Sequence, residues 1–186
     1  MDQAAGKIIL LNGASSVGKS TLCRSIQAQM DEPFLQFSPD FFLFGGQVLP
    51  PRRDPDGPFA WSAVRPRLFE GYFRCLPALA SAGNNLVIDY IIETRAQLDR
   101  LVTLLSGLDV FLVGVHCPLP ELERREGLRG DRGVGDARRD LETVHSFTPY
   151  DVEVDSTRPA EQVAAEIISA WRGRSRPGVF GRLARE

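Results

Sequence analysis

Short apolar runs alternate with longer stretches of helical periodicity along most of the chain. Ile8 to Leu11 is a run of branched apolar residues, and Ser20 to Met30 repeats its apolar positions at helical spacing. Such runs indicate buried strands, and such spacing indicates helices with one apolar face. Further strands are expected at Phe34–Phe37, Leu86–Tyr90, Val110–Val115 and Val152–Val154. Further helices are expected at Arg65–Ala82, Thr94–Leu105, Glu121–Arg129, Asp136–Val144 and Pro159–Trp171.

This alternation predicts an α/β fold in three layers, a central parallel sheet with helices on both faces. From Phe41 to Asp56 the chain is aromatic and then rich in glycine and proline, so we expect an irregular excursion there. After Trp171 the segment RGRSRPGVFGRLARE no longer repeats apolar residues at helical spacing, which predicts a basic, flexible tail over residues 173–186. A nucleic-acid arm is the alternative, but five arginines on an acidic chain do not favour it.

Composition narrows the class of protein. The 186 residues are 43% hydrophobic and 25% charged with a net charge of -2, which fits one globular domain and not a disordered or fibrous chain. No apolar stretch reaches about 18 residues, and a strand begins by Ile8, so we expect a cytoplasmic protein without membrane span or secretory signal. Cys23, Cys75 and Cys117 are widely spaced in apolar surroundings, which favours buried free thiols over a disulfide or zinc site.

The text GASSVGKS, from Gly13 to Ser20, matches the phosphate-binding pattern G-x-x-x-x-G-K-[ST] between an expected strand and helix. In such a loop backbone N–H groups point at phosphate oxygens, and the following helix adds the positive end of its dipole. Lys19 would bridge the β- and γ-phosphates of ATP, and the Ser20 hydroxyl would hold Mg²⁺. A glycine turn with a solvated lysine is the alternative. The residues expected to bind ATP here are Gly13, Ala14, Ser15, Ser16, Val17, Gly18, Lys19, Ser20 and Thr21.

Two acidic residues follow expected strands. Asp40 comes just after Phe34–Phe37 and should face the same crevice as the phosphate loop. It could accept the proton of a substrate hydroxyl and orient that group, or it could merely cap the turn after Pro39. Asp89 ends a strand and could support Mg²⁺, face the substrate or cap the strand. The N-K-x-D motif that reads guanine does not occur, which argues against a GTPase switch.

A segment rich in glycine and arginine, ERREGLRGDRGVGDARR, predicts a small helical lid over about residues 123–139. Arg125, Arg129 and Arg132 lie on a helix end and a glycine-rich stretch, so they could close over the transferred phosphate and exclude water. The alternative is a solvated helix whose arginines pair with neighbouring carboxylates.

Several segments together resemble the chloramphenicol phosphotransferase-like kinases: IILLNGASSVGKS, VIDY, LDVFLVGVHC, REGLRGDR and YDVEVDST. The resemblance implies a P-loop NTPase fold with a small lid, and transfer of the γ-phosphate of ATP to the primary hydroxyl of chloramphenicol. It also implies a catalytic base at Asp40, phosphate and Mg²⁺ contacts at Gly18 to Thr21, and lid arginines at Arg129 and Arg132. The resemblance assigns a lid role to Arg125 less specifically than to Arg129 and Arg132.

The acceptor side departs from that pattern over about residues 41–74 of a kinase domain that spans residues 1–172. The aromatic residues there could line an apolar acceptor pocket or belong to the core. They are Phe41, Phe42, Phe44, Phe59 and Trp61. His145 lies in a family-like segment and could contact substrate, although a capping or core histidine fits as well.

Three functions stay open. The first is an ATP- and Mg²⁺-dependent O-kinase of antibiotic-resistance type, with a small-molecule hydroxyl as acceptor. The second is a metabolic kinase of a sugar, a shikimate-like acid or a nucleoside. The third, from another class, is a nucleotide-binding regulator whose basic tail contacts nucleic acid. The sequence leaves open whether the protein forms a homo-oligomer.

Overall fold

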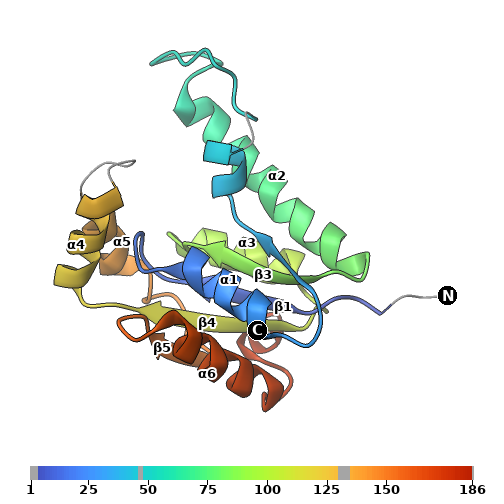
Figure 1. Cartoon of the computed structure of the whole chain (residues 1–186). Coiled ribbons are helices and arrows are strands. Elements are labelled where there is room, and N and C mark those ends of the chain that lie inside the picture. Colours follow the sequence, from blue (N-terminus) through green and yellow to red (C-terminus); the bar gives the residue numbers. More distant parts are fainter. Residues whose placement is uncertain (1–3, 46–47, 130–134, 186) are drawn as a thin grey trace.

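The computed structural model describes residues 4–45, 48–129 and 135–185, the side chain of Arg129 excepted. Five parallel strands form one sheet in the order β2-β3-β1-β4-β5, shown in Figure 1. The strands are β1 (Ile8–Asn12), β2 (Phe34–Phe37), β3 (Asn85–Tyr90), β4 (Val110–His116) and β5 (Val152–Asp155). Each was predicted to within one residue at either end. The central strands β1, β3 and β4 are buried on both faces, which explains their nearly continuous apolar runs.

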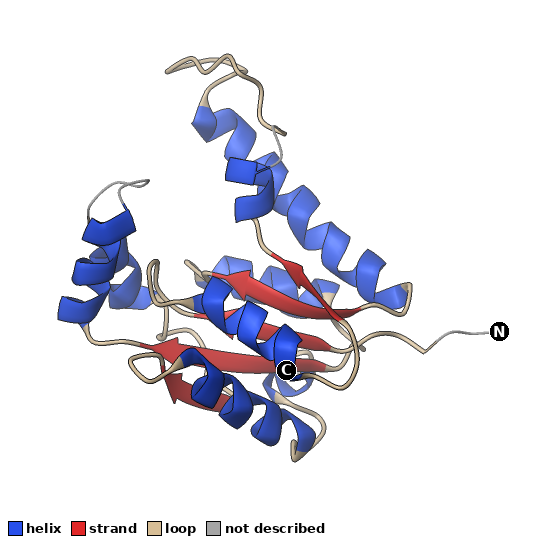
Figure 2. Cartoon of the chain, in the orientation of Figure 1, coloured by secondary structure: helices blue, strands red, loops and turns tan. Residues whose placement is uncertain are grey.

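Helices cover both faces of the sheet (Figure 2). Ile9 and Leu11 of β1 face α1 and α6, whereas Ile8 and Leu10 face the opposite core with α2, α3 and α7. The three-layer α/β prediction is therefore confirmed. The covering helices are α1 (Lys19–Gln29), α2 (Trp61–Ser81), α3 (Arg95–Leu104), α6 (Ala160–Arg172) and α7 (Val179–Leu183).

The predicted excursion is partly ordered. Phe41–Gly45 forms one turn of π-helix, η1, and residues 46 and 47 lie outside the described part of the chain. Helix α2 begins at Trp61, four residues before the predicted start, and continues through Pro66. In Figure 1 the N-terminal half of α2 and η1 stand beyond the edge of the sheet. This arrangement brings the aromatic residues of the excursion next to the end of β2.

Two helices occupy the predicted lid region at the carboxyl end of β4: α4 (Leu119–Arg129) and α5 (Asp136–Thr143). The buried carboxylate of Glu126 joins them by accepting hydrogen bonds from the N–H groups of Gly135 and Ala137, at 2.8 and 2.9 Å. These contacts lower the pKa of Glu126 from its usual value. A carboxylate at a helix N-terminus also complements the helix dipole.

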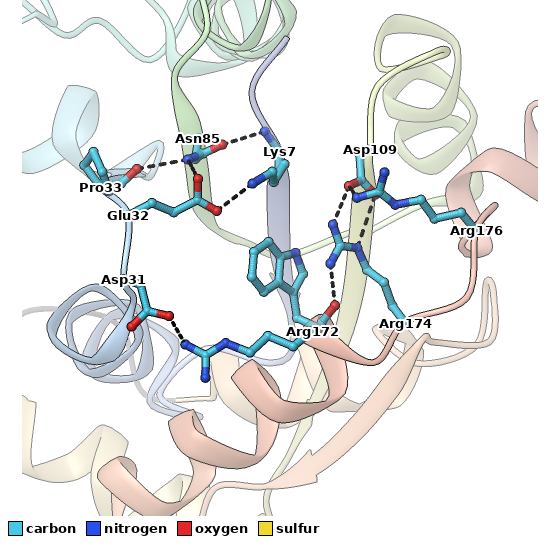
Figure 3. A network of polar contacts seen from close by, with 10 residues as sticks. Lys7, Asp31, Glu32, Pro33, Asn85, Asp109, Arg172, Arg174 and Arg176 are labelled. Carbon is cyan, nitrogen blue, oxygen red and sulfur yellow. Dashed lines mark hydrogen bonds and ion pairs between the residues drawn. The ribbon is translucent and has the colours of Figure 1, made fainter. Parts of the chain in front are cut away.

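The prediction of a flexible tail is wrong for the described residues after α6. Val179 and Phe180 of α7 are buried in the core with α2 and α3, and the Val179 N–H donates to Asp151 at 2.9 Å. Figure 3 shows the polar contacts that lead into this segment: Arg174 and Arg176 both pair with Asp109, the latter at 2.7 Å. The buried pair Val179 and Phe180 therefore anchors this basic segment, together with its polar contacts.

The same network ties both ends of the domain together. Lys7 pairs with Glu32 at 2.6 Å, and Arg172 at the end of α6 pairs with Asp31 (Figure 3). Arg172, Arg174 and Arg176 are thus engaged with carboxylates of the same chain, so these three arginines do not favour a nucleic-acid arm.

Cysteine burial was predicted correctly for two residues and wrongly for the third. Cys23 and Cys117 are buried free thiols, whereas Cys75 is exposed because it lies on the outer face of α2. Across the described ranges, no helix has both the length and the apolar character that a membrane span requires.

Candidate active site

A cavity of about 1050 Å³ lies at the carboxyl ends of β1, β2 and β3. The phosphate loop, the residues after β2, the end of β3 and the start of α5 line it. Ligands of parallel α/β sheets bind at this edge. The predicted site residues that line the cavity are Ser15, Ser16, Val17, Gly18, Lys19, Ser20, Thr21, Asp40, Phe41, Phe44, Asp89 and Arg125.

Both glycines of the phosphate loop are required by its geometry. A Cβ atom at Gly13 would lie 2.5 Å from the carbonyl oxygen of Val115, and Gly18 has a φ of 99°, which favours glycine. Ser16 also has a left-handed backbone, with φ of 62°, although it carries a side chain. Such conformations collect at functional sites because the surrounding structure imposes them.

Lys19 holds the start of the loop in place. Its ammonium group donates to the carbonyl oxygens of Gly13 and Ala14, at 2.8 and 2.9 Å, and the residue is only 6% exposed. Burial lowers the pKa of Lys19, and Asp89, 3.8 Å away, opposes that shift. Gly13 and Ala14, predicted to bind nucleotide, are thus seen to position the lysine.

Asp89 contacts the first turn of α1. One carboxylate oxygen accepts a hydrogen bond from the hydroxyl of Ser20, and the other faces Lys19. The two residues predicted to hold a metal ion are therefore in direct contact. The first turn of α1 and the end of β3 come together because β1 and β3 are neighbours in register, with Leu11 opposite Asp89.

Asp40 lies beyond β2 on the wall of the same cavity. Its backbone N–H donates to the hydroxyl of Ser38 at 3.3 Å. Burial lowers the pKa of Lys19, and the charge of Asp40 opposes that shift, together with the larger opposing effects of Asp89 and Asp140. Three carboxylates therefore act on a single buried ammonium group.

The aromatic residues of the excursion have three different surroundings. Phe41, Phe44 and Trp61 line the cavity and are 46%, 66% and 45% exposed. Phe42 packs into the core edge-on against Phe37, with ring centroids 5.6 Å apart. Phe59 lies under the guanidinium of Arg52, at 4.5 Å.

Several residues that sequence reasoning missed complete the acceptor side. Arg65 of α2 pairs with Glu93 and stacks on Phe69, and all three line the cavity. Tyr90 also lines it, and its hydroxyl is buried without a hydrogen-bond partner in the described part of the chain. Burial raises the pKa of that phenol. Tyr90 follows Asp89 directly at the end of β3, and that position was the available signal.

Only one of the three predicted lid arginines can be placed. The Arg125 guanidinium donates to the carbonyl oxygens of Val17 and Ser156, at 3.1 and 2.9 Å, and pairs with Glu121 at 2.8 Å. The side chain of Arg129 and all of Arg132 lie outside the described residues. Four arginines that were not predicted also line the cavity: Arg24, Arg65, Arg139 and Arg158.

His145 does not line the cavity, and its surroundings match the expected alternative of a core histidine. Its Nδ1 lies 2.7 Å from the hydroxyl of Tyr150, and its ring stacks on His116 with centroids 4.0 Å apart. Burial, with a smaller effect of His116, lowers the pKa of His145 to about 4. Tyr150 accepts a hydrogen bond from Asn12 at 2.8 Å. Asn12 ends β1 directly before Gly13, so this cluster holds the residue from which the phosphate loop begins.

The family model described as "Chloramphenicol phosphotransferase-like protein" matches residues 6–172. A Mycobacterium tuberculosis protein named "Putative O-phosphotransferase Rv2636" is 31% identical over 201 residues, which covers 96% of this chain and 88% of that protein.

Solved structures show the same fold at lower identity. The M. tuberculosis APS kinase CysC, in complex with AMPPNP and APS, has a TM-score of 0.64 and is 19% identical, covering 91% of this chain and 99% of its own. The Deinococcus radiodurans tunicamycin resistance protein has a TM-score of 0.61 at 21% identity, covering 91% and 97%. The fold is that of P-loop NTPases.

Proposed function

The chain belongs to the chloramphenicol phosphotransferase-like family of P-loop phosphotransferases, and we propose that it transfers the γ-phosphate of ATP to a hydroxyl group of a small molecule. The acceptor that we propose is chloramphenicol, at its 3-hydroxyl, or a related antibiotic that is inactivated in the same way.

One observation carries the proposal: Asp40 and the phosphate loop line the same cavity. The loop would hold the β- and γ-phosphates through its N–H groups and Lys19, while Asp40 orients the acceptor hydroxyl from the opposite side. The acceptor oxygen bonds to the γ-phosphorus, the bond from that phosphorus to ADP breaks, and the hydroxyl proton passes to Asp40. The transition state of such transfers is loose, so position matters more than strong basicity.

Residues from the first turn of α1 and the end of β3 fit a magnesium ion. The hydroxyl of Ser20 and the carboxylate of Asp89 are oxygen donors in direct contact beside the phosphate loop, and Mg²⁺ prefers such ligands. Ser20 and Asp89 would hold the ion, with Asp89 acting directly or through water. When bound, Mg²⁺ supplies positive charge that neutralises the phosphate oxygens.

The acceptor half of the cavity suits a mostly apolar molecule with a few polar groups. Phe41, Phe44, Trp61 and Phe69 offer aromatic surface, and the ion pair of Arg65 with Glu93 offers polar groups. Small-molecule sites usually combine apolar walls with a few placed polar groups. A soluble, small acceptor is consistent with this lining.

A transfer assay tests the proposal. The purified protein is incubated with ATP, Mg²⁺ and chloramphenicol, beside a panel of sugars, shikimate-like acids and nucleosides, and the products are identified by mass spectrometry. We expect a phosphorylated product of chloramphenicol or a close analogue. Asp40→Asn should still bind ATP but lose about 10²- to 10⁴-fold in transfer, the contribution of a positioned base.

Asp56→Asn is the matched control, because Asp56 is an exposed carboxylate of the same excursion and does not line the cavity. Its transfer rate should equal that of the unchanged protein. Full turnover by Asp40→Asn would remove Asp40 from the mechanism. Transfer to a metabolite but not to chloramphenicol would make the protein a metabolic kinase.

A further inference from the structure

Helix α5 places one carboxylate against the phosphate loop. Oδ2 of Asp140 accepts a hydrogen bond from the backbone N–H of Ser15, at 3.0 Å, and the side chain of Asp140 is only 9% exposed. The N–H groups of a phosphate loop bind phosphate oxygens. A carboxylate of the chain itself therefore contacts a group that is suited to an anionic ligand.

Asp140 also lies between the loop and the acceptor side. It lines the main cavity and a second cavity of about 400 Å³, whose walls include Arg65 and Glu93. Arg65 and Glu93 belong to the acceptor half of the main cavity as well. A phosphoryl group that leaves the loop for an acceptor has to cross the region between these two sides, so Asp140 stands beside its path.

The charge of Asp140 is only partly balanced at this position. Arg139 is 3.7 Å away, and Lys19 is close enough for the two groups to shift each other's pKa. Burial nevertheless raises the pKa of Asp140, in spite of the Ser15 N–H, Arg139 and Lys19. The negative charge of Asp140 repels a second anion placed beside it. A ligand oxygen that is to accept the hydrogen bond of the Ser15 N–H group must first displace Asp140.

On the basis of the function proposed above, we propose that Asp140 competes with the terminal phosphate of ATP for the Ser15 N–H group and thereby limits the preference of the loop for ATP over ADP. ADP lacks that phosphate, so the competition does not affect it. Looser binding of ATP in the ground state is useful to an enzyme, because only interactions that strengthen in the transition state accelerate the reaction.

Calorimetric titration of Asp140→Asn with two nucleotides tests this role. The amide removes the charge, and its neutral oxygen accepts a weaker hydrogen bond from the Ser15 N–H group than a carboxylate does, so the competition is weakened. With Mg²⁺ present, we expect the Kd for AMPPNP, a triphosphate analogue, to fall about tenfold, while the Kd for ADP changes less than about twofold. Glu142→Gln is the control, since Glu142 is an exposed carboxylate on the same helix. It should change neither Kd by more than about twofold.

Other outcomes would overturn the proposal. Equal tightening of ADP and AMPPNP would mean a general charge effect, and weaker AMPPNP binding would mean that Asp140 supports the loop. Binding of ADP shows that the variant is folded; if it is lost, Asp140→Ser removes the same charge with a smaller side chain. No acceptor takes part, so a wrong acceptor leaves these results unchanged, whereas an unchanged protein that binds neither nucleotide would refute both proposals.

Discussion

The two halves of the cavity are built differently. The phosphate half consists of backbone N–H groups and buried side chains, with Lys19 only 6% exposed and bonded to two carbonyl oxygens of its own loop. The acceptor half relies on the side chains of Phe41, Phe44 and Trp61, which are 45% to 66% exposed. Many contacts hold the first half in place, and few hold the aromatic rim of the second.

This difference means that phosphate binding and the choice of acceptor depend on different parts of the cavity. Every ATP presents the same phosphates, so a backbone cradle with one shape serves all of them. Acceptors differ, and exposed side chains can be exchanged with little effect on the core. A few substitutions in the acceptor half should therefore change the substrate while the phosphate half keeps the chemistry.

Among the three tests of this comparison, the largest expected effect lies in the phosphate half. Lys19→Met removes the ammonium group that would stabilise the transferred phosphate, so the kcat/KM for transfer should fall about 10²- to 10³-fold. Steady-state kinetics with ATP as the varied substrate measures this loss. Lys7→Met removes the other lysine of the chain, which precedes β1 at the opposite end of that strand from the phosphate loop. Its kcat/KM should stay within about twofold of that of the unchanged protein. Comparable losses in both variants would contradict the assignment of Lys19.

A pair of glycine substitutions sharpens the comparison through stability. Gly13→Ala would place its Cβ 2.5 Å from a backbone oxygen, whereas a Cβ at Gly45 of η1 would meet no atom of the described residues within 4 Å. We expect Gly13→Ala to lower the free energy of unfolding by about 1–3 kcal/mol and Gly45→Ala to change it by less than about 0.5 kcal/mol. Urea denaturation followed by circular dichroism gives both values. Similar losses would show that the two halves are equally tightly packed.

The smallest expected effect lies in the acceptor rim. Trp61→Ala should raise the KM for the acceptor that the assay identifies by about tenfold, because it removes apolar surface from the cavity wall. The KM for ATP and the melting temperature should not change, since Trp61 is 45% exposed. Phe59→Ala is the matched control, because Phe59 lies under Arg52 and away from the cavity. If Trp61→Ala raised the KM for ATP as much as the KM for the acceptor, the two halves of the cavity would not bind their ligands independently.

Residues close in sequence were predicted well. The spacing of GASSVGKS predicted the phosphate loop, and the steric demand at Gly13 and the left-handed backbone at Gly18 explain why both glycines stand there. The apolar runs predicted the central strands β1, β3 and β4, because residues buried on both faces leave no room for polar alternation. The shorter edge strands β2 and β5 were also found at their predicted places. These features depend on short stretches of chain, whose geometry their own residues largely impose.

Only the tertiary structure decided which side chains meet across the molecule. The contact between Ser15 and Asp140 spans 125 positions, and that between Asp109 and Arg174 spans 65, so no local pattern encodes them. The same holds for Phe41 at the cavity and Phe42 in the core, which look alike in the sequence. The sequence by itself determined the fold class and the phosphate loop, whereas the acceptor wall, the anchored C-terminal segment and the place of His145 depended on how the helices pack on the sheet.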